Sequence, residues 1–148
     1  MSSAKTLPYE TTLLVRDCCL CLHAQRAARA LGRRFDEALR PFGLTNGQFS
    51  LLMSLNRPEP PPMGPVASLL AMDRTTLTAA LKPLERRGLV KISQDPADRR
   101  SRLLTLSDSG RTLLARAVPV WEKTHRLIEQ LIPDGDPEAL RRGLRALS

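Results

Sequence analysis

Aromatic residues are scarce in this chain. Phe, Tyr and Trp make up 3% of its 148 residues, although 42% of the residues are hydrophobic. The core must therefore be built from Leu, Ala and Val, and this composition favours helices because Leu and Ala are strong helix formers. A chain of this length forms one domain with a substantial core. We therefore expect a mainly α-helical protein with a single domain over residues 1–148.

Long apolar runs are also lacking, and the only three cysteines are bunched at positions 18, 19 and 21. Arg, Asp or Pro interrupts every apolar stretch well short of the ~20 residues that a membrane span needs. No signal peptide is visible, and cysteines this close together cannot form a disulfide framework. We therefore expect a cytoplasmic protein that has no membrane partner.

Catalytic and cofactor motifs are missing as well. The sequence has no Gly-rich phosphate loop, no His-Glu-x-x-His zinc motif and no nucleophile elbow. It also has no spaced pair of carboxylates in an apolar setting. The sequence therefore predicts a protein that is not an enzyme and that needs no cofactor or metal.

Positive charge, by contrast, is abundant and unevenly placed. The net charge is +8, and residues 74–111 hold nine Lys or Arg against four Asp or Glu. A basic balance suits a polyanionic partner, but it also occurs in proteins that bind no nucleic acid. Its location is therefore the stronger signal, because the excess coincides with the most distinctive motif of the chain.

Residues 73–106 have the pattern of a winged helix-turn-helix. Asp73 is a good N-cap for a helix that ends at Gly88, and two short strands follow, joined by the charged turn 94–100. A helix with a polar start fits the major groove of DNA, and an arginine-rich hairpin tip fits the minor groove. The motif therefore predicts a protein that binds double-stranded DNA.

Apolar residues recur at helical spacing in the rest of the chain. The predicted elements are an arm over 1–9, helices over 13–39, 45–55, 65–71, 73–88, 107–131 and 136–147, and strands over 89–93 and 101–106. Thr45 and Gln48 form a capping box at the start of the second helix. Pro83 is expected to bend its helix without ending it, whereas Pro119 is expected to break or kink the helix of 107–131.

The helices within 10–42 and 108–148 carry more apolar surface than a DNA-binding region over 45–106 can cover. Pairing with a second copy of the chain is the natural way to bury this surface. We therefore expect these two segments to be dimerisation helices, and the protein to be a homodimer that binds half-sites about one DNA turn apart.

Five motifs in register resemble those of the MarR family of bacterial transcription regulators. They are Gly43-Leu44-Thr45 with Phe49-Ser50-Leu51-Leu52, Asp73-Arg74-Thr75-Thr76-Leu77-Thr78, Leu84-Glu85-Arg86-Arg87-Gly88-Leu89-Val90, Asp95-Pro96-Ala97-Asp98-Arg99-Arg100 and Leu104-Thr105-Leu106-Ser107-Asp108-Ser109-Gly110. The resemblance covers roughly residues 10–132. It implies a homodimeric winged-helix protein, most often a repressor, that releases DNA when a small ligand binds or a cysteine is oxidised.

Ten residues are expected to contact DNA. They are Arg74, Thr75, Thr76, Thr78, Lys82 and Arg86 on the helix, and Asp98, Arg99, Arg100 and Arg102 on the hairpin. Arg74 can read a guanine, and Thr75 and Thr76 can contact thymine methyl groups or phosphates. Lys82 and Arg86 lie further along the helix and suit phosphates. For each residue the alternative is a side chain that packs, caps or faces water.

The hairpin tip matches the acidic-arginine tip of the family. One of Arg99 and Arg100 is expected to enter the minor groove, where the negative potential favours a cation. Asp98 is expected to hold that arginine by a charge-assisted pair, and Arg102 can reach the DNA backbone. The alternative is an ordinary hairpin turn with exposed charge.

The cysteine cluster of Cys18, Cys19 and Cys21 allows three interpretations. Free cysteines are usually small buried hydrophobes, which favours core packing. Some regulators of the MarR family sense peroxides through a cysteine on the first helix, so a thiol switch is the second. A metal site is the least favoured, because only His23 lies nearby.

The signal to which the protein responds is the most open part of the prediction. His23, Trp121 and His125 fall on the long helices that would frame the ligand pocket of the family, although each histidine also fits an ordinary surface or core position. A small organic anion is the expected effector. The functional alternatives are a redox-sensing regulator and an architectural protein that binds any DNA sequence.

Overall fold

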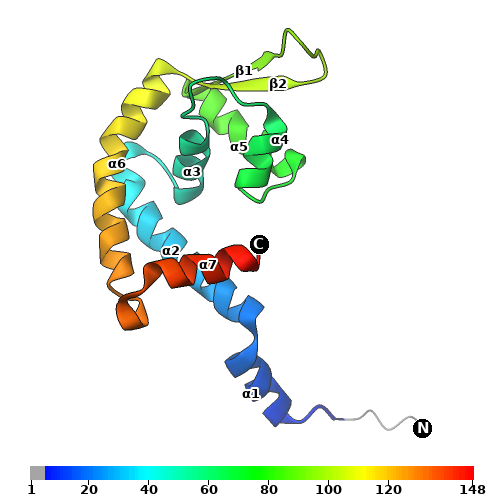
Figure 1. The fold of residues 1–148 in the computed structure, drawn as a ribbon, viewed down its shortest axis with the longest axis vertical. Coiled ribbons are helices and arrows are strands. Elements are labelled where there is room, and N and C mark those ends of the chain that lie inside the picture. The colour runs from blue at the N-terminus through cyan, green and yellow to red at the C-terminus, as the bar shows by residue number, and fades with distance from the viewer. Residues whose placement is uncertain (1–5) are drawn as a thin grey trace, which may run out of the picture.

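The computed structural model describes residues 6–148 and is mainly helical, as the sequence predicts (Figure 1). The elements are α1 (Tyr9–Cys18), α2 (Leu20–Leu39), η1 (Arg40–Phe42), α3 (Asn46–Ser54), α4 (Met63–Leu69), α5 (Arg74–Arg86), β1 (Val90–Gln94), β2 (Arg102–Leu106), α6 (Asp108–Glu129), η2 (Pro133–Gly135) and α7 (Pro137–Ala146). Of the expected N-terminal arm, positions 1–5 lie outside the described residues. Residues 6–8 belong to no helix or strand, and α1 begins at Tyr9.

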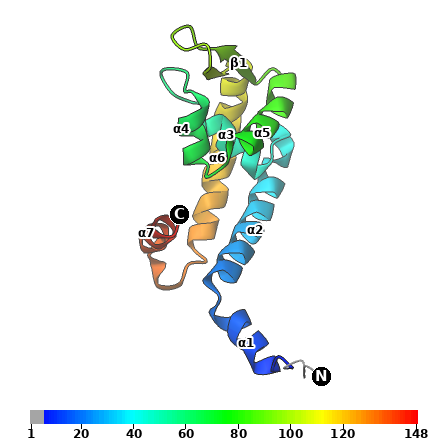
Figure 2. The same ribbon diagram turned by 90° about the vertical axis from the view of Figure 1, so that its right-hand side faces the viewer.

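The molecule has a globular end and an extended end. Helices α3, α4 and α5 and the hairpin of β1 and β2 form the globular end, and α2 and α6 run side by side away from it (Figures 1 and 2). At the extended end α7 and α2 lie on opposite sides of α6, and α1 continues beyond α2 (Figure 2). None of the helices in the described part of the chain combines the length and apolarity needed to cross a bilayer.

The core lies at the globular end and is made mostly of leucine, with a few Phe, Val and Ala residues. Leu77, Leu81 and Leu84 are completely buried on one side of α5, at the spacing that places them on one helical face. They join Leu39 from the end of α2 and Leu104 from β2, which are also completely buried. Helix α5 is therefore fixed to the core along one side, and its other side is left for solvent.

Local capping signals set the ends of two helices as predicted. The Thr45 hydroxyl accepts the N–H of Gln48 at 3.2 Å, and the Gln48 side chain accepts the N–H of Thr45 at 3.1 Å, which completes the capping box of α3. The Asp73 carboxylate accepts the N–H of Thr76 at 2.7 Å at the start of α5. Gly88 follows α5 with a left-handed φ of 71°, which glycine adopts without steric cost. Pro83 lies inside α5 without ending it.

Two expectations about helix ends were wrong. The expected helix over 13–39 is divided at Cys19, whose extended backbone (φ −70°, ψ 108°) separates α1 from α2. The Cys19 sulfur accepts the N–H of Leu22 at 3.4 Å, so the cysteine acts as the N-cap of α2. Helix α4 begins at Met63 rather than at Pro65.

The expected break at Pro119 does not occur either, because α6 continues from Asp108 to Glu129. Ala117 is completely buried, and the ring of Trp121 lies 6.0 Å from that of Phe49. Packing on both sides of Pro119 holds the helix together although the proline cannot donate its backbone hydrogen bond.

The hairpin is joined to the proline-rich connector along the outer edge of β2. β1 and β2 pair in an antiparallel register, with Val90 opposite Leu106 and Ile92 opposite Leu104. Both strands begin one residue later than expected. On the other side of β2, the N–H of Leu104 donates to the carbonyl of Pro61 at 2.9 Å, so the proline-rich connector runs along the second strand.

Ser107 connects the hairpin to α6 and to the end of α5. Its hydroxyl donates to the carbonyl of Gly88 at 2.6 Å, and its Oγ accepts the N–H of Gly110 at 3.0 Å. Its own N–H donates to the carbonyl of Leu89 at 3.0 Å. A second connection lies between α5 and the turn after α2, where Arg87 donates to the carbonyl of Gly43 at 2.7 Å.

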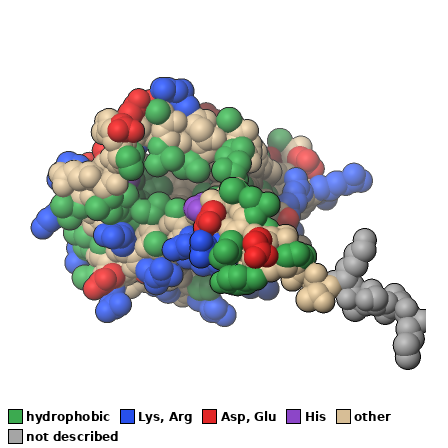
Figure 3. Space-filling model, turned by 90° about the horizontal axis from the view of Figure 1, so that it is seen from below, with side chains coloured by type: hydrophobic (Ala, Val, Ile, Leu, Met, Phe, Trp, Pro, Cys, Tyr) green, Lys and Arg blue, Asp and Glu red, His purple; other side chains and the backbone are tan. Residues whose placement is uncertain are grey.

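The extended end leaves its apolar side chains uncovered in the single chain. α1 and α7 bury no residue, and α2 buries only Phe35 and Leu39, near its C-terminal end, where it meets the globular end. The exposed large hydrophobic residues there are Leu7, Tyr9, Leu14, Val15, Leu20, Leu31, Leu127, Leu131, Leu140, Leu144 and Leu147. Seen from this end, hydrophobic side chains cover much of the surface (Figure 3). Arg141 of α7 makes an ion pair of 2.9 Å with Glu129 at the end of α6, and a second ion pair of 2.9 Å with Glu138 within α7 itself.

Candidate nucleic-acid interface

The outer side of α5 carries the polar residues that the sequence singled out. The exposed side chains are Arg74, Thr75, Thr76, Thr78, Lys82 and Arg86. The N–H of Thr76 donates to the Asp73 carboxylate, and this bond holds the pKa of Asp73 below its usual range. The Thr78 hydroxyl donates to the carbonyl of Arg74 at 2.8 Å, which fixes the orientation of the threonine side chain.

The hairpin tip over 95–101 is ordered by its own hydrogen bonds. The Asp95 carboxylate accepts the N–H of Ala97 at 2.9 Å, and the Asp98 carboxylate accepts the N–H of Arg100 at 3.0 Å. The Gln94 side-chain amide donates to the carbonyl of Arg99 at 2.9 Å and so spans the tip. The tip therefore presents its arginines from a defined backbone rather than from a loose turn.

Asp98 acts differently from the expectation. In the described part of the chain its carboxylate bonds the backbone N–H of Arg100 and makes no ion pair with an arginine side chain. The reason is local, because an aspartate two residues before an N–H readily closes a turn onto it. Both guanidinium groups of the tip thus remain available to a partner. The role of Gln94 was not predicted, because no local motif gives a signal for it.

A groove of about 460 Å³ brings the helix and the hairpin together. Arg74 and Thr78 line it from α5, and Arg100 and Arg102 line it from the hairpin. The remaining lining residues are Pro62, Met63, Gly64, Pro65, Asp98 and Ser101. Residues that are far apart in sequence thus form one concave basic surface, and the start of α4 also lines it. Sequence reasoning also missed this contribution of α4.

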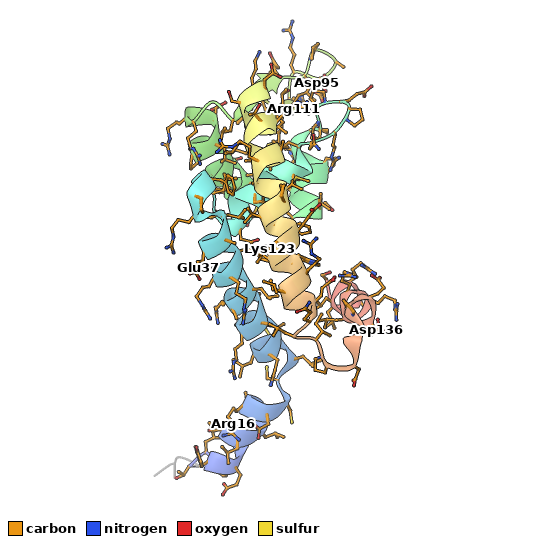
Figure 4. All side chains as sticks on the ribbon, turned by 90° about the vertical axis from the view of Figure 1, so that its left-hand side faces the viewer. Arg16, Glu37, Asp95, Arg111, Lys123 and Asp136 are labelled. Atoms are coloured by element: carbon orange, nitrogen blue, oxygen red, sulfur yellow. The ribbon has the colours of Figure 1, made fainter. Side chains whose placement is uncertain are left out.

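Five of the expected contacts lie outside the groove. They are exposed but do not line it: Thr75, Thr76, Lys82, Arg86 and Arg99. Asp95, on the hairpin, and Arg111, near the start of α6, lie at the same end of the molecule, and Arg16 lies at the opposite end (Figure 4). The concave basic surface is thus confined to the globular end.

Comparison with known proteins agrees with this geometry. The family model for MarR matches residues 44–101. The M. tuberculosis regulator MosR, solved in complex with DNA, is 36% identical, with 87% of this chain and 92% of that chain covered and a TM-score of 0.79. The chain belongs to the MarR family of transcriptional regulators.

Other transcription regulators are similar over different lengths. The repressor CouR, solved on a 23-mer DNA duplex, is 30% identical, with 90% of this chain and 94% of that chain covered and a TM-score of 0.79. CouR from Rhodococcus jostii RHA1 has also been solved with p-coumaroyl-CoA. The activatory protein BadR of Rhodopseudomonas palustris is 36% identical over 100 residues. That match covers 66% of this chain and 53% of BadR, so the chain spans about half the length of this curated relative.

A second cleft, of about 550 Å³, lies between α3, the end of α4 and α6 of this MarR-family chain. Its lining consists of Phe49, Ser50, Met53, Ser54, Leu69, Val118, Trp121 and Glu122. The lining is thus mainly apolar and aromatic. Within residues 6–148, Glu122 is the only charged side chain of the lining, and no Lys, Arg or His takes part. An organic anion, the effector expected from the sequence, would find no basic partner here.

The three expected effector residues are not brought together. Trp121 lines the cleft, and the His125 ring stacks on it with the ring centroids 4.8 Å apart. Trp121 also lies 6.2 Å from Phe35 near the end of α2. His23 precedes Phe35 by twelve residues, which corresponds to about 18 Å of helix. Its Nδ1 lies 2.8 Å from the carbonyl oxygen of Cys19, so His23 lies apart from Trp121 and His125 within one chain.

The cysteines also differ from the expectation of core packing. Cys18 and Cys21 are exposed and Cys19 is half-buried, and all three are free thiols. They lie around the break between α1 and α2, at the extended end, where the single chain has no core. Across the described residues, no group of three or more His, Cys, Asp or Glu side chains is arranged to hold a metal ion.

Proposed function

We propose that the chain is a cytoplasmic, homodimeric repressor that binds operator DNA sequence-specifically and is released by a small molecule. The main support for this proposal is the groove between α5 and the hairpin. Arg74 and Thr78 of α5 meet Arg100 and Arg102 of the hairpin on one surface, so that α5 reads base edges in the major groove while the hairpin enters the minor groove. The phosphates of the same DNA attract the basic excess.

The uncovered helices support a homodimer. Short helices that bury nothing are only marginally stable in water, yet α1 and α7 bury no residue in the single chain. A second copy that packs on Leu140 and Leu144 of α7, and on the equally exposed Leu14 of α1, removes this apolar surface from water. The two-fold symmetry of such a dimer places two recognition helices on successive turns of DNA.

The cleft lined by Trp121 supports release by a small molecule. It lies between α6, which continues into the extended end, and α3 and α4 of the globular end. A ligand there changes the DNA affinity to the extent that it prefers one arrangement of the two ends over the other. CouR, which has been solved both on DNA and with a small molecule, offers a parallel for such control.

A binding measurement tests the function directly. The purified protein is titrated against its own upstream intergenic DNA and against a scrambled duplex of equal length, at physiological salt. We expect a preference of about 10³ or more for the upstream DNA, with a stoichiometry of two chains per site. Equal affinity for both duplexes would instead identify an architectural DNA-binding protein and would contradict the proposal.

A thiol switch is the second candidate for the signal, and the position of Cys19 favours it. Cys19 caps α2 at the break between two helices of the extended end, and the exposed Cys18 and Cys21 flank it. Peroxide oxidises a thiol to a sulfenic acid, and a second thiol displaces water from it to form a disulfide. Such a bond would change the angle between α1 and α2.

Replacement of the three cysteines by Ser tests the switch. We expect peroxide to weaken DNA binding of the unaltered protein at least about tenfold and dithiothreitol to restore it, while the triple-Ser protein binds DNA equally well before and after peroxide. Fluorescence polarisation of a labelled duplex measures both proteins. An equal loss in the triple-Ser protein would rule out the cysteines as the sensor.

A further inference from the structure

The cleft lined by Trp121 has an unusual charge for a protein of this composition. The chain has a net charge of +8, yet among the residues that the structure describes the one charged side chain of the lining is the carboxylate of Glu122. Glu122 makes no ion pair with any of the described residues. Its basic neighbour on α6, Lys123, does not line the cleft. A ligand in the cleft therefore meets a negative charge that no arginine or lysine of the lining balances.

The other lining groups favour an aromatic ligand. The indole ring of Trp121 and the ring of Phe49 lie 6.0 Å apart, and both line the cleft. Indole is the side chain over which a cation is held most strongly, through the negative face of the ring. Met53 and Leu69 add flexible apolar surface at the edge of the cleft. The Ser54 hydroxyl donates to the carbonyl of Leu51 at 2.6 Å, so its proton is not available to an anionic ligand.

We infer that this cleft selects an aromatic cation, such as an aromatic amine or a quaternary ammonium compound, over an aromatic carboxylate. The inference rests on the proposed function, in which the cleft is the effector site, and it specifies the chemistry of the effector. The ring stacks against Trp121 and Phe49, and the positive group lies near the carboxylate of Glu122. An aromatic carboxylate of the same size fits the apolar part but places its charge against that of Glu122.

The fluorescence of Trp121 can report ligand binding in the cleft, because Trp121 is the only tryptophan in the sequence. The full-length protein is titrated with benzyltrimethylammonium and, separately, with benzoate at the same ionic strength, and quenching of tryptophan fluorescence is recorded. We expect saturable quenching by the cation and a dissociation constant for benzoate at least about fivefold weaker. Equal or tighter binding of benzoate, or no saturable quenching by the cation, would overturn the inference.

Two substitutions test whether the carboxylate of Glu122 causes the preference for the cation over benzoate. E122Q should weaken binding of the cation about fivefold, and E122K should reverse the preference in favour of benzoate. E37Q is the matched control, because Glu37 is exposed on α2 and does not line the cleft. An unchanged affinity of E122Q for the cation would overturn the assignment.

Release of DNA is measured separately, by polarisation of the labelled upstream duplex in the presence of the cation. Weakened DNA binding in the unaltered protein, with a reduced effect in E122Q, supports both the charge preference and the effector role. Quenching without any release of DNA contradicts the effector role of the cleft in the proposed function, but leaves its preference for a cation intact. The two ideas can therefore fail independently.

Discussion

A protein in which Arg74 and Arg100 are both replaced by Ala should bind its operator at least about a hundredfold more weakly than the unaltered chain. Both side chains line the groove, one from α5 and one from the hairpin, and each good contact to a base contributes about 1–3 kcal/mol. Titration of a labelled duplex at several salt concentrations measures the effect. The slope of log affinity against log salt should fall by about one for each phosphate that the variant no longer neutralises.

The matched control is the double replacement of Arg26 and Arg29 by Ala. Both residues are exposed on α2, so this variant loses the same charge from the extended end. We expect it to bind the operator nearly as well as the unaltered chain. R99A should lose less affinity than R100A, because Arg99 does not line the groove. Equal losses in the control and the groove variant would show that total charge, rather than the groove, sets the affinity.

Replacement of Gly110 by Ala should lower the free energy of unfolding by about 1–3 kcal/mol. A Cβ at this position would overlap the carbonyl oxygen of Leu89 and would lie 2.7 Å from Cδ1 of Leu106. The overlap with Leu89 is with backbone, which cannot rotate away as a side chain can. The same carbonyl accepts the N–H of Ser107, so relief of the overlap disturbs the junction between the hairpin and α6.

Urea unfolding at one fixed protein concentration measures the loss, since the stability of a dimer depends on concentration. G32A is the matched control, because a Cβ at Gly32 on α2 would meet no atom within 4 Å. Alanine is also the better helix former, so G32A should keep or gain up to about 1 kcal/mol. A G110A protein as stable as G32A would show that the junction can rearrange without cost.

The parts of the fold that local sequence determines could be predicted. Asp73 and Thr76 lie three residues apart and form the cap of α5, and Thr45 and Gln48 form a capping box in the same way. These interactions depend on spacing along the chain, so a motif reveals them. The same holds for Gly88, whose left-handed conformation follows directly from its position after α5.

The parts that depend on packing could not be predicted. Pro119 was expected to break or kink α6, but the helix is not broken, because burial of Ala117 and stacking around Trp121 hold it together. The contribution of α4 to the groove likewise arises from the fold. His23 and His125 fall on helices that lie side by side, but only the three-dimensional positions show that they are far apart. The charge of the cleft also depends on which side of α6 faces α3.

The hydrogen bond from Arg87 to Gly43 has a mechanical consequence. It connects the end of α5 to the turn that follows α2, so we expect α5 and α2 to move together as one unit. The 20 residues of α2 give this unit a length of about 30 Å. In the proposed homodimer, a rotation of α2 by roughly 6° about its first residues, at the extended end, moves the DNA-binding end by about 3 Å. This distance is close to the rise of one base pair. In the proposed homodimer, an effector would therefore shift the position of the protein along its operator without touching any side chain that is proposed to contact DNA.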